Sequence, residues 1–188
     1  MAKLQNQVRI IGGEWRRRLL RFSSAADLRP TPDRVRETVF NWLGQTLEGK
    51  QCLDLFAGSG ALGFEAASRA ARQVVMVEHD RVAFAALLAN VEALQADNIE
   101  LQCQDALNFL GSDRRRFDVV FLDPPYQQGL LPQLLAKIGP HLAAGALVYL
   151  EADQLPQIPS AFRIARRSRA GQVNYLLLES GDHGGEIQ

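Results

Sequence analysis

A regular alternation of short apolar runs and helical segments between residues 51 and 150 constrains the fold of this 188-residue chain more than any other feature. Apolar runs typical of buried strands occupy residues 52–56, 74–78, 99–103, 118–122 and 146–150. Helical segments separate them, over residues 61–70, from residue 81 onward, and over 106–110 and 130–138. The alternation predicts an α/β fold with a mostly parallel sheet that helices cover on both faces. Two later runs, 162–167 and 173–178, flank Gly171 and predict a closing antiparallel hairpin.

A small basic arm or β-hairpin is expected ahead of this sheet. Apolar runs at 7–11 and 19–22 flank a Gly-Gly pair and an arginine-rich stretch. Thr31 is expected to cap the following helix, with Pro32 at its first position. We therefore predict an arm over residues 1–30, a main domain over 31–180 and a disordered tail over 181–188.

Charge is unevenly distributed, although the net charge is zero. Residues 1–36 hold nine basic groups against three acidic ones, and residues 37–113 hold four against eleven. A basic arm on an acidic body favours a polyanionic partner, and eight of the nine basic groups are arginines, which pair well with phosphate. Trp15 within the arm either stacks on an unpaired base or packs the arm onto the body. The arginines expected to contact nucleic acid are Arg16, Arg17, Arg18, Arg29, Arg34 and Arg36.

Composition and cysteine content limit the number of domains and the kinds of site that this chain can have. A content of 47% hydrophobic residues suits one domain with a proper core. Cys52 and Cys103 are isolated in apolar runs, which favours buried free thiols over a disulfide or a metal site. We expect no metal, no signal peptide and no membrane span, and therefore a cytoplasmic protein, expected to be a monomer.

The run 117–126, FDVVFLDPPY, ends a buried strand in an acid, two prolines and an aromatic ring. Pro124 and Pro125 have a fixed φ and no N–H, so the strand stops at a stiff corner. The Asp123 carboxylate and the Pro124 carbonyl can accept both N–H bonds of an exocyclic amine, while Tyr126 stacks on its ring. The alternative is a proline-bounded strand exit whose acid faces water, and the tetrapeptide alone does not separate the two.

The expected strand ends carry further acids and a glycine turn. Residues 58–63, GSGALG, match G-x-G-x-x-G between a strand and a helix, and Glu78 follows about 20 residues later. This pattern suits a nucleotide cofactor. Asp54 would repel a pyrophosphate, which disfavours a nicotinamide dinucleotide. The cationic, phosphate-free S-adenosylmethionine fits, with Glu78 on the ribose and Asp105 on the adenine amine.

These motifs resemble those of known methyltransferases. DLFAGSGALG, VEHD, the turn at Asp105 and DPPY are similar, in order, to the motifs of the Rossmann-like class I methyltransferases. RIIGGEWRRR followed by RPTPDRVRETVFNWL resembles the RsmD family, bacterial methyltransferases that modify a guanine N2 of 16S rRNA. The resemblance extends from about Val8 to Glu179, and Arg17 stands where that family usually has Gly.

The resemblance implies a role for each matching residue. The donor would contact Asp54, Phe56, Ala57, Gly58, Ser59, Gly60, Glu78, Asp105 and Ala106. The catalytic corner would comprise Asp123, Pro124, Pro125 and Tyr126. The implied reaction converts S-adenosyl-L-methionine to S-adenosyl-L-homocysteine on 16S rRNA, within a small-subunit ribonucleoprotein particle. A DNA adenine-N6 methyltransferase, a non-catalytic RNA-binding assembly factor and a nicotinamide oxidoreductase are the alternatives.

Overall fold

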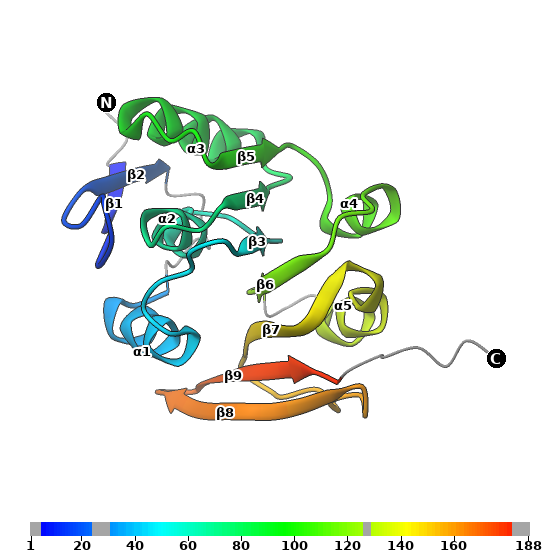
Figure 1. The fold of residues 1–188 in the computed structure, drawn as a ribbon. Coiled ribbons are helices and arrows are strands. Elements are labelled where there is room, and N and C mark those ends of the chain that lie inside the picture. Colours follow the sequence, from blue (N-terminus) through cyan, green and yellow to red (C-terminus); the bar gives the residue numbers. More distant parts are fainter. Residues whose placement is uncertain (1–4, 24–30, 126–128, 182–188) are drawn as a thin grey trace.

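A seven-stranded sheet forms the centre of the computed structural model, which describes residues 5–23, 31–125 and 129–181. Its order in space is β5-β4-β3-β6-β7-β9-β8 (Figure 1). The strands are β3 (Gln51–Asp54), β4 (Gln73–Val77), β5 (Ile99–Gln102), β6 (Phe117–Leu122), β7 (Leu142–Ala152), β8 (Phe162–Ala170) and β9 (Val173–Ser180). The first five are parallel and β9 runs antiparallel to β7 and β8. The predicted mostly parallel α/β sheet with a closing hairpin is confirmed.

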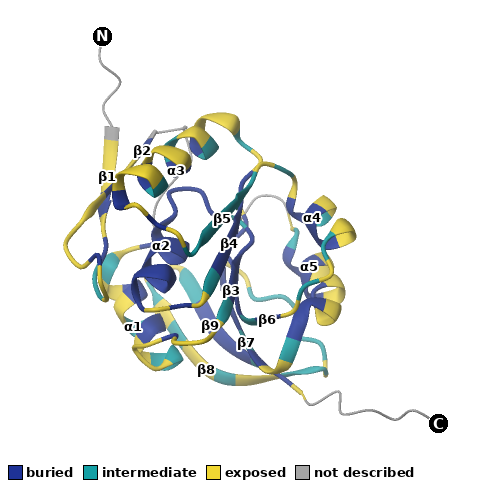
Figure 2. Cartoon of the chain, turned by 45° about the horizontal axis from the view of Figure 1, so that its top comes forward, coloured by how far each residue is buried: buried dark blue, intermediate teal, exposed yellow. Residues whose placement is uncertain are grey.

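Helices cover both faces of the sheet. Helices α1 (Asp33–Leu43), α2 (Ala61–Ser68) and α3 (Arg81–Leu94) lie on one face, and α4 (Ala106–Ser112) and α5 (Leu131–Lys137) on the other (Figure 1). A short 3₁₀ turn, η2 (Gly139–His141), precedes β7. Along β4, Val74 and Met76 face the first core while Val75 and Val77 face the second. The central strands are therefore buried on both faces, which explains their continuous apolar runs (Figure 2).

Most element boundaries differ by a few residues from the sequence expectation, and two of these differences have clear local reasons. Strand β3 ends at Asp54 because the chain leaves the ladder there for the glycine turn. Strand β5 ends at Gln102, so Cys103 lies beyond it and is exposed. The prediction of two buried thiols is thus right for Cys52 and wrong for Cys103. No helix in the described part of the chain is both long enough and apolar enough to span a membrane.

The predicted N-terminal hairpin is present as β1 (Gln5–Arg9) and β2 (Leu19–Ser23). Its side chains join the core on the α1–α3 face, and Trp15 is buried there with only 9% of its surface exposed. The stacking role considered for Trp15 is therefore wrong, because its ring packs the arm onto the body. Arg17 has φ +72°, which lies in the left-handed region that favours glycine. This backbone conformation explains why the resembled family usually has Gly at that position.

Helix α1 begins one residue later than predicted. The Pro32 carbonyl accepts the first helical hydrogen bonds, from the N–H groups of Val35 (2.9 Å) and Arg36 (3.0 Å), so Pro32 is the N-cap. Thr31 therefore does not cap the helix. Its hydroxyl instead donates towards a carboxylate oxygen of Asp123, 92 residues further along the chain.

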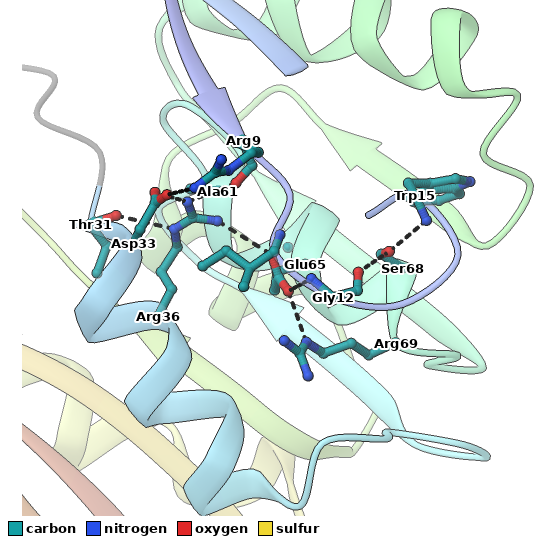
Figure 3. A network of polar contacts seen from close by, with 12 residues as sticks. Arg9, Gly12, Trp15, Thr31, Asp33, Arg36, Ala61, Glu65, Ser68 and Arg69 are labelled. Carbon is teal, nitrogen blue, oxygen red and sulfur yellow. Dashed lines mark hydrogen bonds and ion pairs between the residues drawn. The ribbon is translucent and has the colours of Figure 1, made fainter. Parts of the chain in front are cut away.

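A buried carboxylate, Glu65, joins the arm to α1 and α2 (Figure 3). Its oxygens accept hydrogen bonds from the backbone N–H groups of Ile11 (2.8 Å) and Gly12 (2.7 Å) in the arm. They also accept from Arg36 Nη1 (3.3 Å) in α1 and from Arg69 Nε (2.8 Å) just after α2. Arg36 is fully buried and donates further to the carbonyls of Thr31 and Arg9 and to Asp33. Since buried charges need complete pairing, this cluster fixes how the three segments meet.

Replacing Glu65 by Gln should lower the free energy of unfolding by about 3–5 kcal/mol, because it leaves two buried arginines short of their anionic partner. Denaturant unfolding at neutral pH measures this loss. Glu179→Gln, which removes an exposed ion pair with Arg163, is the control and should cost at most about 1 kcal/mol. Equal effects of the two substitutions would contradict a central role for Glu65.

Candidate active site at the carboxyl edge of the sheet

The strand order reverses between β3 and β6. From β3 the chain builds outward through β4 to β5, and it then returns to place β6 on the other side of β3. In open α/β sheets, ligands bind beyond the carboxyl ends of the strands at such a reversal. Asp54 ends β3 and pairs in register with Phe121, so Asp123 leaves the neighbouring strand two residues later.

Backbone hydrogen bonds shape the turn after β3. The buried Asp54 carboxylate accepts the Gly63 N–H at 2.9 Å, tying the start of α2 back to the strand. Gly58 and Gly60 have φ of +51° and +80°, values that side-chain-bearing residues rarely adopt. The Asp54 pKa is raised to about 7, chiefly by burial and also by the nearby charge of Glu78, while hydrogen bonds from the N–H groups of Gly63 and Phe56 partly oppose this rise. A cationic ligand beside Asp54 would therefore stabilise the ionised form of its carboxyl group.

Glu78 braces the same turn from the end of β4. One of its oxygens accepts the Gly58 N–H at 2.8 Å and the other accepts the Asp80 N–H at 2.8 Å. Each carboxylate oxygen has a second lone pair, so Glu78 can still accept from a ligand hydroxyl. The structure thus brings Glu78 beside the residues 57–60, as the motif spacing predicts.

Asp105 follows β5 and caps α4. Its Oδ1 accepts from the N–H groups of Leu107 (2.8 Å) and Asn108 (3.1 Å), and the side chain is exposed at the same edge. The next residue, Ala106, is buried. Capping fixes the direction of the carboxylate, and a contact between Asp105 and an adenine amine stays a prediction.

Asp123 lies directly after β6 in an acidic environment. Burial raises the pKa of its carboxyl group well above the ordinary value, and the charges of Glu151 and Asp54 raise it further. The Thr31 hydroxyl, 3.5 Å from Asp123 Oδ2, acts in the opposite direction by stabilising the ionised form. Pro124 is buried and Pro125 is exposed, while Tyr126 lies outside the described residues.

Sequence reasoning missed Thr31 and Glu151 as members of this site. Glu151 lies at the end of β7, is buried, and accepts a hydrogen bond from the Tyr149 hydroxyl at 2.5 Å. The sequence analysis identified the site from acidic residues at the ends of four other strands. An acidic residue also lies at the end of β7, so the same criterion would have identified Glu151. Thr31 had no such signal, because its contact with Asp123 joins two residues that are 92 positions apart in the chain.

The predicted nucleic-acid-binding arginines do not lie together. Gly12 and Trp15 are held beside Ser68, at the end of α2 furthest from the glycine turn, so Arg16, Arg17 and Arg18 lie towards the opposite edge of the sheet. The eight residues of α2 span about 12 Å. A surface hollow of about 470 Å³ near this loop, lined partly by Arg16 and Arg69, is likewise away from the carboxyl edge.

Arg36 is fully buried with its guanidinium bonded to protein groups, so the prediction that it contacts nucleic acid is wrong. Arg34 is exposed in the first turn of α1, three residues from Thr31. Arg29 lies outside the described residues.

The sheet order, the glycine turn and the acids at the strand ends define a Rossmann-like methyltransferase fold. The structure of SMU.776 complexed with SAH shares this fold at a TM-score of 0.63 and 16% identity, over 78% of this chain and 48% of that one. The family model described as "Conserved hypothetical protein 95" matches residues 8–179.

Curated and solved relatives cover nearly the whole chain. Ribosomal RNA small subunit methyltransferase D of Escherichia coli (strain K12) is 42% identical over 183 residues, which is 95% of this chain and 92% of the relative. The solved structure of yhhF from Escherichia coli has 42% identity and a TM-score of 0.85, over 94% of this chain and 99% of that one. The chain belongs to the RsmD family.

Replacing Gly60 by Ala should destabilise the glycine turn. An added Cβ would lie 2.5 Å from Phe64 Cδ2 and 2.8 Å from Leu87 Cδ2, in a backbone with φ +80°. Left-handed strain and overpacking together predict a loss of about 2–4 kcal/mol in the free energy of unfolding, measured by denaturant titration.

Gly111→Ala in α4 is the matched control. A Cβ there meets nothing within 4 Å, so the substitution should stabilise the protein by about 0.5–1 kcal/mol. A neutral Gly60→Ala would contradict the tight packing of this turn.

Proposed function

We propose that this chain transfers a methyl group from S-adenosyl-L-methionine to the exocyclic N2 of a guanine in 16S rRNA of the small ribosomal subunit. The observation that carries the proposal is the meeting of Asp54, Glu78 and Asp123 at one edge of the sheet, where the strand order reverses. The family supports the substrate, since a relative that covers 95% of the chain is named for small-subunit ribosomal RNA.

Residues at β3, β4 and β5 are suited to hold the donor, which when bound supplies an electrophilic methyl group on a sulfonium. The backbone of Phe56, Ala57, Gly58, Ser59 and Gly60 follows the methionine portion. Asp54 offers negative charge to the donor's ammonium group. Glu78 accepts from the ribose hydroxyls, and Asp105 with Ala106 contacts the adenine.

Asp123 and Pro124 position the acceptor amine. A guanine amine is a weak nucleophile because its lone pair is delocalised into the ring. If the Asp123 carboxylate and the Pro124 carbonyl accept its two N–H bonds, the nitrogen becomes pyramidal and its lone pair points at the methyl carbon. A bound S-adenosylmethionine would supply the methyl group to this nitrogen, and Asp123 would accept the proton that the amine loses. Pro125 stiffens this corner, and Tyr126 stacks on the base.

Holding the amine and the methyl donor in the right geometry supplies most of the rate enhancement in this scheme. Such positioning can lower the activation barrier by about 7–11 kcal/mol. The target base must leave its stack, and RNA loops make this easiest. The physiological substrate is 16S rRNA within a small-subunit particle, and the enzyme acts as a monomer in the cytoplasm without a metal. Acceptor assays on rRNA and on duplex DNA separate this proposal from adenine-N6 methylation of DNA, and mapping methyl groups on rRNA from cells with and without the protein locates the base.

Asp123→Ala should abolish methyl transfer by at least about 10³-fold while donor affinity changes little, because Asp123 contacts the amine rather than the donor. Radiolabelled methyl transfer to rRNA and calorimetric titration of S-adenosylmethionine measure the two quantities. An active Asp123→Ala enzyme would refute the assignment.

Thr31→Val should move the acidic limb of the kcat/KM profile to higher pH. Asp123 must be ionised to accept from the amine, so activity is lost as pH falls through its raised pKa. Removing the Thr31 hydroxyl removes the group that opposes this rise. Thr31→Ser restores the hydroxyl and should restore the profile. A pH profile unchanged in Thr31→Val would show that the hydroxyl has only a packing role.

Donor affinity should weaken as pH falls below about 7. In the free protein Asp54 is protonated below its raised pKa of about 7, and it must lose that proton to attract the donor's ammonium group. Affinity should also decline above about pH 8, where the donor's α-amino group loses its charge. Calorimetry from pH 5.5 to 9 tests this, and Asp54→Asn should bind more weakly and remove the acidic limb. An acidic limb that persists in Asp54→Asn would assign it to another group.

A further inference from the structure

The edge strand β8 carries a strip of arginines that the reaction scheme does not use. Four of its nine residues are arginines and all four are exposed. Arg163 at the start of the strand forms an ion pair with Glu179 on β9. In the described part of the chain, no acidic group lies within ion-pair distance of Arg166, Arg167 or Arg169.

Strand register places the end of this strip at the catalytic edge. Strand β8 runs parallel to β7, since both are antiparallel to β9. Arg169 lies opposite Asn174, which in turn lies opposite Ala152, the residue after Glu151. This register places Arg169 and the end of β6 on the same edge of the sheet. Three strand spacings separate β8 from β6, which corresponds to about 14 Å.

The strip has arginines on both faces of the sheet, because adjacent residues of a strand point their side chains to opposite faces. A shift between Ile164 and Arg166 sets Arg166 opposite Leu177 and Arg167 opposite Leu176. These leucines belong to the two different cores, so the arginines beside them flank the edge on both sides of the sheet. A backbone that passes along this edge therefore meets guanidinium groups on either side.

We propose that Arg166, Arg167 and Arg169 form a phosphate-binding strip for the RNA that carries the target base. This proposal rests on the proposed function. The strip provides exposed arginines at the edge of the sheet where Asp123 lies. The arm does not provide them, since Arg16, Arg17 and Arg18 lie towards the other edge, and Arg36 is buried. Arginine presents a planar fork that pairs with phosphate oxygens.

The competing explanation is that these arginines only prevent edge-to-edge pairing with a second copy of the chain, a common use of charge on edge strands. The two explanations differ in their dependence on salt. Each phosphate contact to single-stranded RNA adds about 0.7 to the slope of log affinity against log salt concentration, whereas an edge guard adds nothing.

The test compares the wild-type enzyme with a variant carrying Arg166→Ala, Arg167→Ala and Arg169→Ala. The probes are a full-length 16S rRNA transcript and small subunits from cells that lack the enzyme. We expect the salt slope to fall by about 2 and the RNA Kd at 0.1 M salt to rise about tenfold to a hundredfold. Affinity for S-adenosylmethionine and the rate at saturating RNA should not change.

Two further variants act as controls. Arg163→Ala lies on the same strand, is already paired with Glu179 and is at the other end, so it should leave the slope unchanged. The single Arg169→Ala, at an exposed strand end, should lower the slope by about 0.7 and covers the case in which the triple variant does not fold.

If the triple variant keeps the wild-type salt dependence of RNA affinity, whether or not it self-associates, the proposal is overturned. The arginines would then serve only to prevent edge-to-edge pairing of β8. A wild-type enzyme that methylates no rRNA would overturn the proposed function itself, and this strip with it. A wild-type enzyme that methylates rRNA beside an unaffected triple variant would overturn the strip alone.

Discussion

The four hydrogen bonds to Glu65 hold together the parts of this protein that the active site needs. Glu65 lies on α2, which begins at the glycine turn, and its partner Arg36 lies on α1, which begins beside Thr31. Arg36 also donates to the Thr31 carbonyl, and the Thr31 hydroxyl reaches Asp123. One buried ion cluster thereby sets the positions of the glycine turn, the arm and Thr31, the neighbour of Asp123, relative to one another.

Three acids at neighbouring strand ends, of which Asp54 and Glu151 are buried and Asp123 is half-buried, work against stability in the free protein. Glu151 and Asp54 repel Asp123, and burial raises the pKa of both Asp54 and Asp123. A group whose pKa is raised on folding contributes its stability at low pH and loses it as pH rises through the folded-state pKa. For Asp54 this loss extends from about pH 4 to about pH 7. A cationic donor would relieve this repulsion, so the instability and the proposed donor affinity have the same physical origin.

Much of the architecture was predictable because it depends on local pattern. Apolar runs bounded by turn residues identified every strand of the sheet, and the spacing of Gly58, Gly60 and Gly63 located the turn that Asp54 and Glu78 brace. The arginines of the arm were harder to interpret. Composition predicts that a segment is basic, but only packing decides whether a guanidinium is exposed like that of Arg34 or buried like that of Arg36.

The sequence alone determined the fold class, the order of the elements and the strand-end acids, since each depends on residues close together in the chain. Tertiary structure decided which distant groups meet: Thr31 with Asp123 across 92 residues, Glu65 with the arm, and Asp123 with both Asp54 and Glu151. It also placed Arg169 at the same edge of the sheet as Asp123, through the register of β7, β9 and β8. Such contacts depend on how helices dock and strands pair, and local periodicity carries no information about either.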